Sequence, residues 1–461
     1  MTDSWEKLRK DAREIWNAGV AAVDSKHLVE QAITLKDETL LIEDQQFTVT
    51  DANRIVVIGA GKAGAGMATG LESVLYDQGD FSGQVEGWVN VPADCTQSLR
   101  SIHLHPARPA GLNEPTKDGV TGSQTILELV SSLEPSDLCI CLLSGGGSAL
   151  LPAPLAGISL ADKQLVTQFL SGAGANIQQL NTVRKQLSEI KGGRLAEACQ
   201  ADRLITLIIS DVPGDPLDII ASGPTVPDSS CTEDAIEILD TFGARQTDSL
   251  DPIYHALKSR LKNQVTTKRT ALPKVSNYII GNNDLAVQAA LREAQQRGYR
   301  CESESALNLE GRAEEIGQQL SRKGLQMRSA GNIDCWISGG EPTVELVPAA
   351  LRGQGGRNQQ LVLAALIDQF QASRGPDQPF PWHHMALLSG GTDGEDGPTD
   401  AAGAYIDEQV IQLVRQEGLD PQDYLDRNDA YSFFAAVQAL IKTGPTHTNV
   451  CDLRILLVVP Q

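Results

Sequence analysis

The sequence lacks the features of secreted, zinc-binding and membrane proteins. Its eight cysteines include no CxxC pair, and the two nearest, Cys139 and Cys141, lie in an apolar run, which indicates reduced core thiols. No run approaches the length of a membrane-spanning helix. Residues 1–16, MTDSWEKLRKDAREIW, carry acidic residues and an amphipathic pattern, whereas a secretory signal needs a basic start and an apolar core. We therefore expect a cytoplasmic protein that does not bind membranes.

Positive charge is also scarce. The 461 residues include 38 Lys+Arg and 59 Asp+Glu, which gives a formal net charge of -21. This balance disfavours non-specific attraction to nucleic acid, so any bound phosphate must be held by a local cluster of cations. Neither an HExxH nor a GxSxG motif occurs. The sequence therefore favours small-molecule partners, and it leaves both a monomer and a homodimer open.

Six short apolar runs each end in a turn rich in glycine or aspartate and then lead into a helical pattern. They are residues 54–64, 138–151, 204–215, 277–286, 334–344 and 384–394. Such Val/Ile/Leu runs predict buried parallel strands of an α/β protein, whose ligands bind beyond the carboxyl ends of the strands. Because 245–276 contains no strong strand, we predict two domains, 1–250 and 275–461.

The first of these turns, GAGKAG (59–64), has the GxGxxG spacing of a dinucleotide-binding fold. Gly59 and Gly61 would let a phosphate approach backbone amides at a helix N-terminus. The turn is not a Walker A loop, because Ala63 replaces the Ser or Thr that would hold magnesium. Lys62 is a cation that a dinucleotide turn does not need. A tight turn with a solvated lysine is the structural alternative.

Two other segments could contact phosphate. One is SGGGS, in which the backbone amides of Ser144, Gly145, Gly146, Gly147 and Ser148 would surround a phosphate chain. The other is a helix predicted over 181–194, in which Arg184 and Lys191 are seven residues apart and project from one face. A solvated amphipathic helix is the commoner explanation of such a charge run.

Carboxylates and one arginine follow the later runs. Asp211 could accept a proton from a hydroxyl group or ligate Mg²⁺, although an Asx turn explains it equally well. Arg357 lies between a glycine run and an apolar helix, which suits a carboxylate or phosphate ligand. The stretch SGGTDGEDGPTDAAG (389–403) fails as an EF-hand loop. It predicts a magnesium site that nucleotide phosphate completes, with Asp393 and Asp396 as ligands.

Taken together, these segments resemble the class II glycerate kinases, a family with a DUF4147 domain followed by a MOFRL domain. The matching stretches are GAGKAG (59–64), LSGGGSALL (143–151), NTVRKQLSEIKGGRLA (181–196), SDVPGDPLDIIASGPT (210–225), GGRNQQ (355–360), SGGTDGEDGPTDAAGA (389–404) and GPTHTNVCDL (444–453). The resemblance implies a Rossmann-like parallel-sheet N-terminal domain, a smaller α/β C-terminal (MOFRL) domain, and an active site in the cleft between them. It also implies ATP- and Mg²⁺-dependent phosphorylation of D-glycerate to 2-phosphoglycerate.

Lys62, Asp211 and Arg357 fall on the functional lysine, aspartate and arginine of that family. Two positions depart from its usual GPTGTNVND signature, because His447 and Cys451 replace the glycine and the second asparagine. Two alternative functions remain: an NAD(P)-dependent hydroxypyruvate reductase, with Glu86 near the expected ribose-binding position, and a non-catalytic nucleotide- or metabolite-binding protein.

Overall fold

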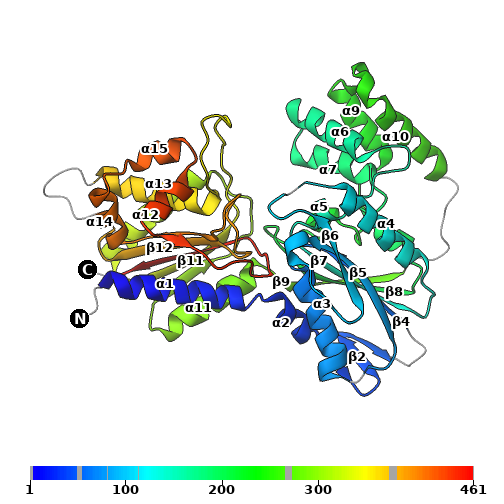
Figure 1. The fold of residues 1–461 in the computed structure, drawn as a ribbon, viewed down its shortest axis with the longest axis horizontal. Helices are drawn as coiled ribbons and strands as arrows, with labels where there is room; N and C mark the ends of the chain where they lie inside the picture. The colour runs from blue at the N-terminus through cyan, green and yellow to red at the C-terminus, as the bar shows by residue number, and fades with distance from the viewer. Residues whose placement is uncertain are drawn as a thin grey trace. The chain divides into compact units, whose positions relative to one another are not determined.

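The computed structural model describes residues 4–48, 54–79, 81–112, 114–264, 273–372 and 382–459, which form two compact units (Figure 1). Unit 1 comprises Met1–Asp24, Asp211–Asp215 and Gly281–Gln461, and unit 2 comprises Ser25–Ser210 and Pro216–Ile280. The predicted domains, 1–250 and 275–461, follow chain order. The compact units do not, because the first helix and residues 211–215 pack in unit 1.

Unit 2 is built on a six-stranded sheet with the order β6-β5-β4-β7-β8-β9. Its strands are β4 (Arg54–Ala60), β5 (Gln84–Pro92), β6 (Ile102–Arg108), β7 (Leu138–Ser144), β8 (Arg203–Ile209) and β9 (Lys274–Gly281). The pairs β4–β5, β4–β7, β5–β6 and β7–β8 are parallel. Strands β4, β7 and β8 are buried almost throughout, as expected for a parallel sheet covered on both faces. The predicted Rossmann-like parallel sheet is confirmed.

Helices and a small antiparallel sheet complete unit 2. The helices that pack on or near the parallel sheet are α2 (Ser25–Ala32), α3 (Gly64–Glu72), α4 (Lys117–Ser131), α5 (Gly147–Leu150) and α8 (Arg194–Ala198). Four others, α6 (Leu160–Gly172), α7 (Ile177–Gln186), α9 (Thr232–Thr241) and α10 (Asp251–Gln264), form a separate group (Figure 1). This group has its own apolar core, which includes Val166, Val183 and Leu239. Strands β1 (Ile33–Lys36), β2 (Thr39–Ile42) and β3 (Gln45–Thr48) form the antiparallel sheet.

Unit 1 contains a mixed sheet with the order β10-β11-β15-β12-β13-β14. Its strands are β10 (Cys301–Glu304), β11 (Cys335–Gly340), β12 (Met385–Gly391), β13 (Gly403–Ile406), β14 (Leu440–Ile441) and β15 (Asp452–Val458). Only β10 and β11 pair in parallel, whereas β15 lies between β11 and β12 and is antiparallel to both. The prediction that 334–344 and 384–394 form parallel strands of βα units was therefore wrong in the pairing, because β15 separates them.

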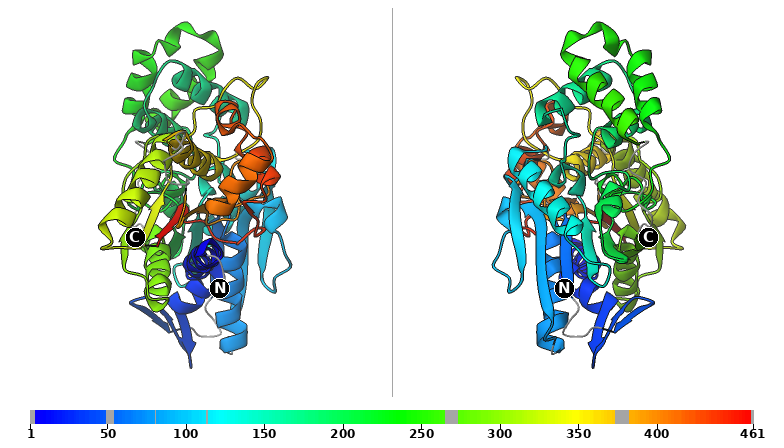
Figure 2. Two further views of the ribbon diagram at one scale, coloured as in Figure 1. Left: turned by 90° about the vertical axis from the view of Figure 1, so that its left-hand side faces the viewer. Right: turned by 90° about the vertical axis from the view of Figure 1, so that its right-hand side faces the viewer.

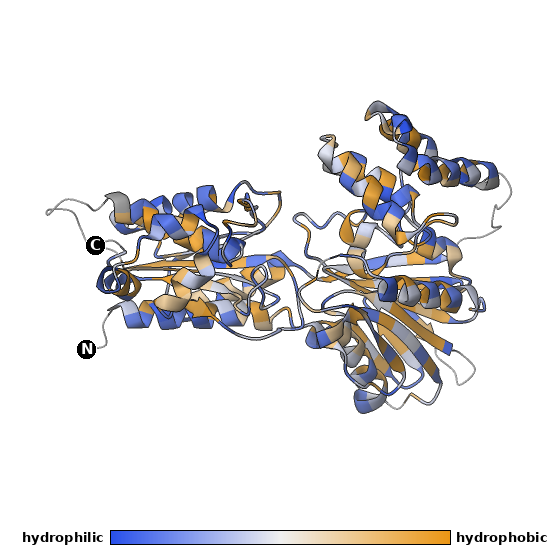
Figure 3. Ribbon diagram, turned by 45° about the horizontal axis from the view of Figure 1, so that its top comes forward, coloured by the Kyte–Doolittle hydropathy of each residue, from blue (hydrophilic) through white to orange (hydrophobic). Residues whose placement is uncertain are grey.

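Helices cover both faces of this sheet (Figures 1 and 2). Helices α1 (Ser4–Ala21) and α11 (Asn283–Gln296) pack on one face, where Ala386 and Leu388 of β12 point. Helices α12 (Ala313–Ala330), α13 (Arg357–Ala372), α14 (Glu408–Gln416), α15 (Pro421–Asp426) and α16 (Ala430–Ala436) belong to the other face, where Met385 and Leu387 point. Figure 3 shows apolar residues concentrated on the strands. All eight cysteines are free thiols, and no helix among the described residues has the length and apolarity to cross a membrane.

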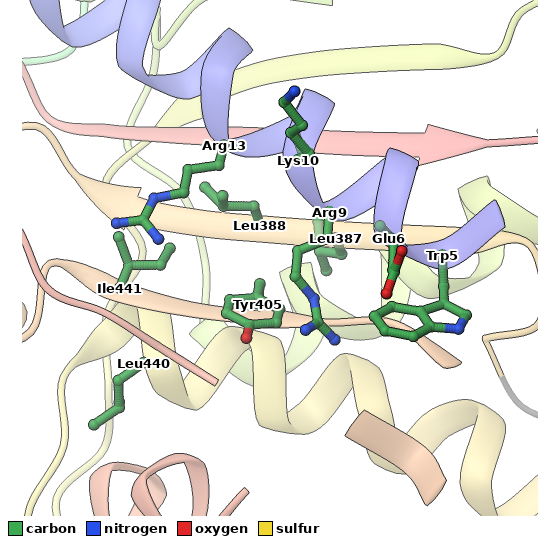
Figure 4. Close-up of a pocket in the computed structure, with 12 residues that line it drawn as sticks. Trp5, Glu6, Arg9, Lys10, Arg13, Leu387, Leu388, Tyr405, Leu440 and Ile441 are labelled. Atoms are coloured by element: carbon green, nitrogen blue, oxygen red, sulfur yellow. The ribbon is translucent and has the colours of Figure 1, made fainter. Parts of the chain in front are cut away.

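Arg9 attaches α1 to the rest of unit 1. Its guanidinium donates two hydrogen bonds, of 2.6 and 2.8 Å, to Asp407, which is fully buried and also caps α14 by accepting from the Val410 amide. Figure 4 shows Arg9 between the rings of Trp5 and Tyr405, which lie 4.9 and 4.7 Å from the guanidinium carbon. These side chains line a pocket of about 350 Å³ between α1 and strands β12 to β14. Arg9 is therefore both an ion-pair partner and a packing residue.

We expect Arg9→Ala to lower the free energy of unfolding by about 2–4 kcal/mol, because Asp407 would stay buried without its cation. Urea-induced unfolding measures this change. Lys10→Ala is the matched control, since the Lys10 side chain is 73% exposed on the same helix. Equal unfolding midpoints for the two variants would contradict the assigned role of Arg9.

Candidate functional site

The turn at 59–64 connects β4 to α3 and is locked against the end of β7. A Cβ atom built on Gly61, whose φ is +149°, would lie 2.0 Å from the Ser144 Oγ, and one on Gly59 would lie 2.2 Å from the Leu142 carbonyl oxygen. Both glycines are therefore required for close packing of β4 on β7. The Lys62 amide donates to the Gly145 carbonyl (2.9 Å), and the Ala63 amide donates to the Ser144 Oγ (3.0 Å).

These contacts change the predicted role of the turn. The amides of Gly61 and Gly64 are also bonded, to the Asn90 and Gly61 carbonyls, so four successive amides of the turn have protein acceptors. They are not aimed at a ligand as the amides of a phosphate-binding turn would be. By contrast, the neighbouring loop 144–148 leads into α5, and the first amides of a helix have no intrahelical acceptor.

Two cations lie near the left-handed residue of that loop. Gly146 has a φ of +76°, and a Cβ atom built on it would be 3.6 Å from the Lys62 Cγ and 3.7 Å from the Arg108 Nη2. The structure thus places Lys62 beside the loop 144–148. Sequence reasoning missed Arg108, which is buried at the end of β6.

Arg184 and Lys191 meet at Ser148. The Arg184 Nη2 donates to the Ser148 Oγ (3.1 Å), and the Lys191 Nζ donates to both the Oγ (2.7 Å) and the carbonyl oxygen (2.8 Å) of Ser148. Burial lowers the pKa of Lys191 well below its usual value, and the neighbouring cations Lys163 and Arg184 lower it further. The structure therefore brings three residues of the predicted phosphate site together.

The predicted helix over 181–194 was wrong in its second half. Helix α7 ends at Gln186, and α8 begins only at Arg194. Gly192 and Gly193, with φ of +60° and +80°, form a turn that a helix cannot contain. Arg184 lies on α7 and Lys191 lies in the non-helical segment after it. The two side chains therefore meet at Ser148 without sharing a helical face.

Arg357 is paired with two carboxylates at the start of α13. Its guanidinium donates two hydrogen bonds to Asp452 (2.8 and 3.0 Å) and one to Glu341 (2.7 Å). Burial lowers the pKa of Arg357, but Asp452 and Glu341 raise it more, so its pKa lies well above the usual value. Sequence reasoning missed both carboxylates. The only available signal for Glu341 was its place directly after the Ser-Gly-Gly turn of β11.

We expect Arg357→Met to lower the free energy of unfolding by about 3–5 kcal/mol, because Asp452 is fully buried and would lose its cation. Urea-induced unfolding of the single variant and of Arg357→Met/Asp452→Leu tests this. The double variant should recover much of the loss, since it leaves no fully buried charge unpaired and the Glu341 side chain is 37% exposed to water. A double variant less stable than Arg357→Met would contradict the explanation.

Asp396 caps α13, and its predicted role in positioning magnesium, directly or through water, stays a prediction. It is 2% exposed, and its two oxygens accept the Asn358 amide (3.0 Å) and the Gln359 amide (2.8 Å). Burial raises its pKa to about 7, although these two amides oppose the shift. Asp393 accepts the Glu395 amide (3.1 Å) through its Oδ1. Within the described ranges, no group of three or more His, Cys, Asp or Glu side chains is arranged to hold a metal.

Asp211 belongs to unit 1 and contacts the segment 444–453. Its carboxylate accepts from the Asn449 Nδ2 (3.2 Å), and its carbonyl oxygen accepts from the Cys451 Sγ (2.9 Å). Cys451 and His447 have φ of +67° and +57°, which explains why glycine or asparagine suits these two positions better. The departure at position 451 therefore places a strained cysteine next to Asp211.

The parallel sheet with its glycine-rich strand-to-helix turn, together with a second α/β unit, defines a two-unit α/β protein with a Rossmann-like portion. Two family models match the chain: the domain of unknown function DUF4147 over residues 11–255, and the MOFRL family over residues 334–452. The chain is 34% identical to the D-glycerate 2-kinase of Thermotoga maritima, over 98% of this chain and 99% of that protein. It is 33% identical to the glycerate kinase of Rattus norvegicus, over 98% and 94%.

The chain is also similar to a solved structure of a protein with the same name as these relatives. The crystal structure of a glycerate kinase from Thermotoga maritima matches with a TM-score of 0.78 and 33% identity, over 98% of this chain and all of that chain. A protein of Agrobacterium vitis named as a putative hydroxypyruvate reductase is 39% identical, over 88% of this chain and 99% of that protein. The chain belongs to the glycerate kinase family.

Proposed function

We propose that this enzyme transfers the γ-phosphoryl group of ATP to the 2-hydroxyl of D-glycerate, giving 2-phosphoglycerate and ADP. The observation that carries the proposal is the convergence of Arg184 and Lys191 on Ser148, in a chain with a net charge of -21. Such a local cluster is what an acidic protein needs to bind a phosphate chain. The choice of D-glycerate as the acceptor is supported by the relatives named glycerate kinase and D-glycerate 2-kinase.

Phosphoryl transfer requires positioning and charge neutralisation more than covalent chemistry by the protein. In this proposal the loop 144–148, Arg184 and Lys191 bind the phosphates of ATP, and Lys62 offsets the charge that develops on the transferred group. Gly59 and Gly61 permit the close packing that sets the position of Lys62. When Mg²⁺ is bound with the nucleotide, Asp393 would hold it directly or through water, and the ion would neutralise phosphate charge.

Asp211 and Arg357 act on the acceptor in this proposal. Asp211 orients the 2-hydroxyl of glycerate and accepts its proton. An arginine side chain has five N–H donors. Asp452 and Glu341 accept three hydrogen bonds from Arg357, so the other two donors can bind the glycerate carboxylate or the γ-phosphate. The two carboxylates fix the plane of the guanidinium and therefore the direction of its free N–H groups.

An NAD(P)-dependent hydroxypyruvate reductase is the alternative, because one relative carries that name. A ribose-binding acid is expected at the end of the strand next to the glycine turn. Glu86 instead lies near the start of β5 and is paired with Arg54 at 2.9 Å. The bonded amides of the 61–64 turn also disfavour a pyrophosphate ligand there. A non-catalytic nucleotide-binding protein differs from both enzymes in showing no turnover.

The test is ADP release from ATP and Mg²⁺ with D-glycerate, with L-glycerate and without acceptor, followed by phosphorus NMR of the product. Formation of 2-phosphoglycerate with D-glycerate alone is the expected result. If ADP forms with neither enantiomer while NADH is consumed with hydroxypyruvate, the kinase proposal is wrong. ATP binding without any turnover would instead favour the non-catalytic alternative.

A further inference from the structure

Lys163 belongs to the same cluster of cations as Arg184 and Lys191. Lys163, Val166 and Leu170 are spaced by three and four residues, so they share one face of α6. Val166 and Leu170 pack in one apolar core with Val183 of α7, the residue next to Arg184. Lys163 thus lies on the side of α6 that faces α7, and its charge interacts with those of Arg184 and Lys191.

This cluster has almost no negative charge of its own. The charged groups that act on Lys163 from the neighbouring elements are Arg184 on α7, Arg194 on α8, Lys191 and the carboxylate of Glu189. Glu189 has the smallest of the effects on the pKa of Lys163, and Asp162, on α6 itself, is engaged with Ser159 at the helix N-terminus. Among the described residues, neither Lys163 nor Arg184 nor Lys191 forms an ion pair with a carboxylate.

Unpaired charges of one sign are costly to bury, and they persist in proteins where a ligand neutralises them. We propose that Lys163 is the third cation of the anion site at Ser148, and that the ligand of this site is a phosphate group carrying at least two negative charges. The inference rests on the proposed function only for the source of the phosphate, which is either the nucleotide or the phosphorylated acid. A site with three basic side chains suits a phosphate dianion better than the single charge of the glycerate carboxylate, because a dianion favours the charged form of each side chain.

A proton is coupled to binding at this site. Burial, followed by repulsion from Arg184 and Arg194, lowers the pKa of Lys163 to about 7 in the free protein. Lys163 is therefore mostly neutral at pH 8. A bound dianion favours the charged ammonium and raises this pKa, so binding at pH 8 takes up a proton. Affinity for phosphate consequently falls as the pH rises above about 7.

The experiment is isothermal titration calorimetry of the full-length protein with inorganic triphosphate at pH 8, in buffers that differ in ionisation enthalpy. ATP and 2-phosphoglycerate are titrated in parallel to identify the source of the phosphate, and D-glycerate serves as the singly charged comparison. We expect the wild-type protein to take up more protons on binding triphosphate than a variant in which residue 163 cannot titrate. Lys163→Met should weaken this binding about tenfold to a hundredfold.

Lys258→Met is the matched control, because it removes the same charge from an exposed position on α10 of the same unit. Lys163→Arg should retain most of the affinity but take up fewer protons than the wild type, since an arginine stays charged throughout and only Lys191 can still titrate. This variant also keeps the test valid if Lys163→Met folds poorly. Equal triphosphate affinity for Lys163→Met and Lys258→Met, or unchanged proton uptake by Lys163→Arg, would overturn the inference. Because the probe is inorganic triphosphate, either result is independent of whether the protein phosphorylates glycerate.

Discussion

Lys62→Ala is expected to lower kcat/KM for glycerate phosphorylation by about 100-fold or more, which corresponds to about 3 kcal/mol of lost transition-state stabilisation. The turn should survive the change, because its contact with Gly145 uses the backbone amide of residue 62 and not the side chain. Steady-state kinetics with D-glycerate measure the loss. The thermal unfolding midpoint should stay within about 2 °C of the wild-type value.

Lys117→Ala is the control for this experiment, since Lys117 is an exposed lysine at the start of α4 in the same unit. It should retain full activity. A Lys62→Ala enzyme as active as this control would remove Lys62 from the mechanism. A loss of activity accompanied by a large drop in the unfolding midpoint would show that the turn needs the lysine side chain for its own structure.

Asp211→Asn is expected to lower kcat by about 100- to 10,000-fold while ATP binds with nearly unchanged affinity. The substitution preserves the size of the side chain, and an asparagine oxygen can still accept from the Asn449 Nδ2, whereas the negative charge and the ability to accept a proton are lost. The measurements are kcat, the KM for D-glycerate, and the Kd for ATP by calorimetry. Loss of ATP binding with kcat retained would instead assign Asp211 to the nucleotide.

Asp215→Asn supplies a matched control within the same short segment. Asp215 accepts from the Asn282 Nδ2 (2.6 Å) and has a φ of +55°, a conformation that asparagine tolerates. We expect this variant to keep kcat within about threefold of wild type, since asparagine retains both the hydrogen-bond acceptor and the backbone conformation. A collapse of both variants would show that the segment 211–215, and not the Asp211 carboxylate, is the sensitive feature.

The local features of unit 2 could be predicted from sequence because each depends on neighbouring residues. The run 54–60 forms β4, and glycines at 59 and 61 fit the close approach of β7. The pairing in unit 1 could not be predicted in this way. An apolar run such as 452–458 specifies that a strand forms but not its neighbours, and β15 inserts between β11 and β12 in the opposite direction.

Roles of charged residues were harder to predict than elements. The acidic loop at 389–403 predicts a metal site. The sequence does not show that Asp396 accepts hydrogen bonds from the first amides of α13, one of which belongs to Gln359, 37 residues earlier in the chain. Lys163 lies in no glycine-rich motif, so nothing in its local sequence distinguishes it from a solvated lysine on an amphipathic helix. Its surroundings exist only after α6 packs on α7.

The chain order of unit 1 has a consequence for biosynthesis. Helix α1 leaves the ribosome before residues 281–461, which provide the sheet face that buries its apolar residues Leu8, Ile15 and Trp16. At ordinary translation speeds the intervening residues take roughly 10 to 60 s to synthesise. Unit 2 can therefore fold before the sheet of unit 1, on which α1 packs, has been synthesised. A fragment that starts at residue 281 would likewise expose the apolar face carrying Leu388 and Ile455. Newly made chains should therefore be most prone to aggregation, and to capture by chaperones, just before the last strand emerges.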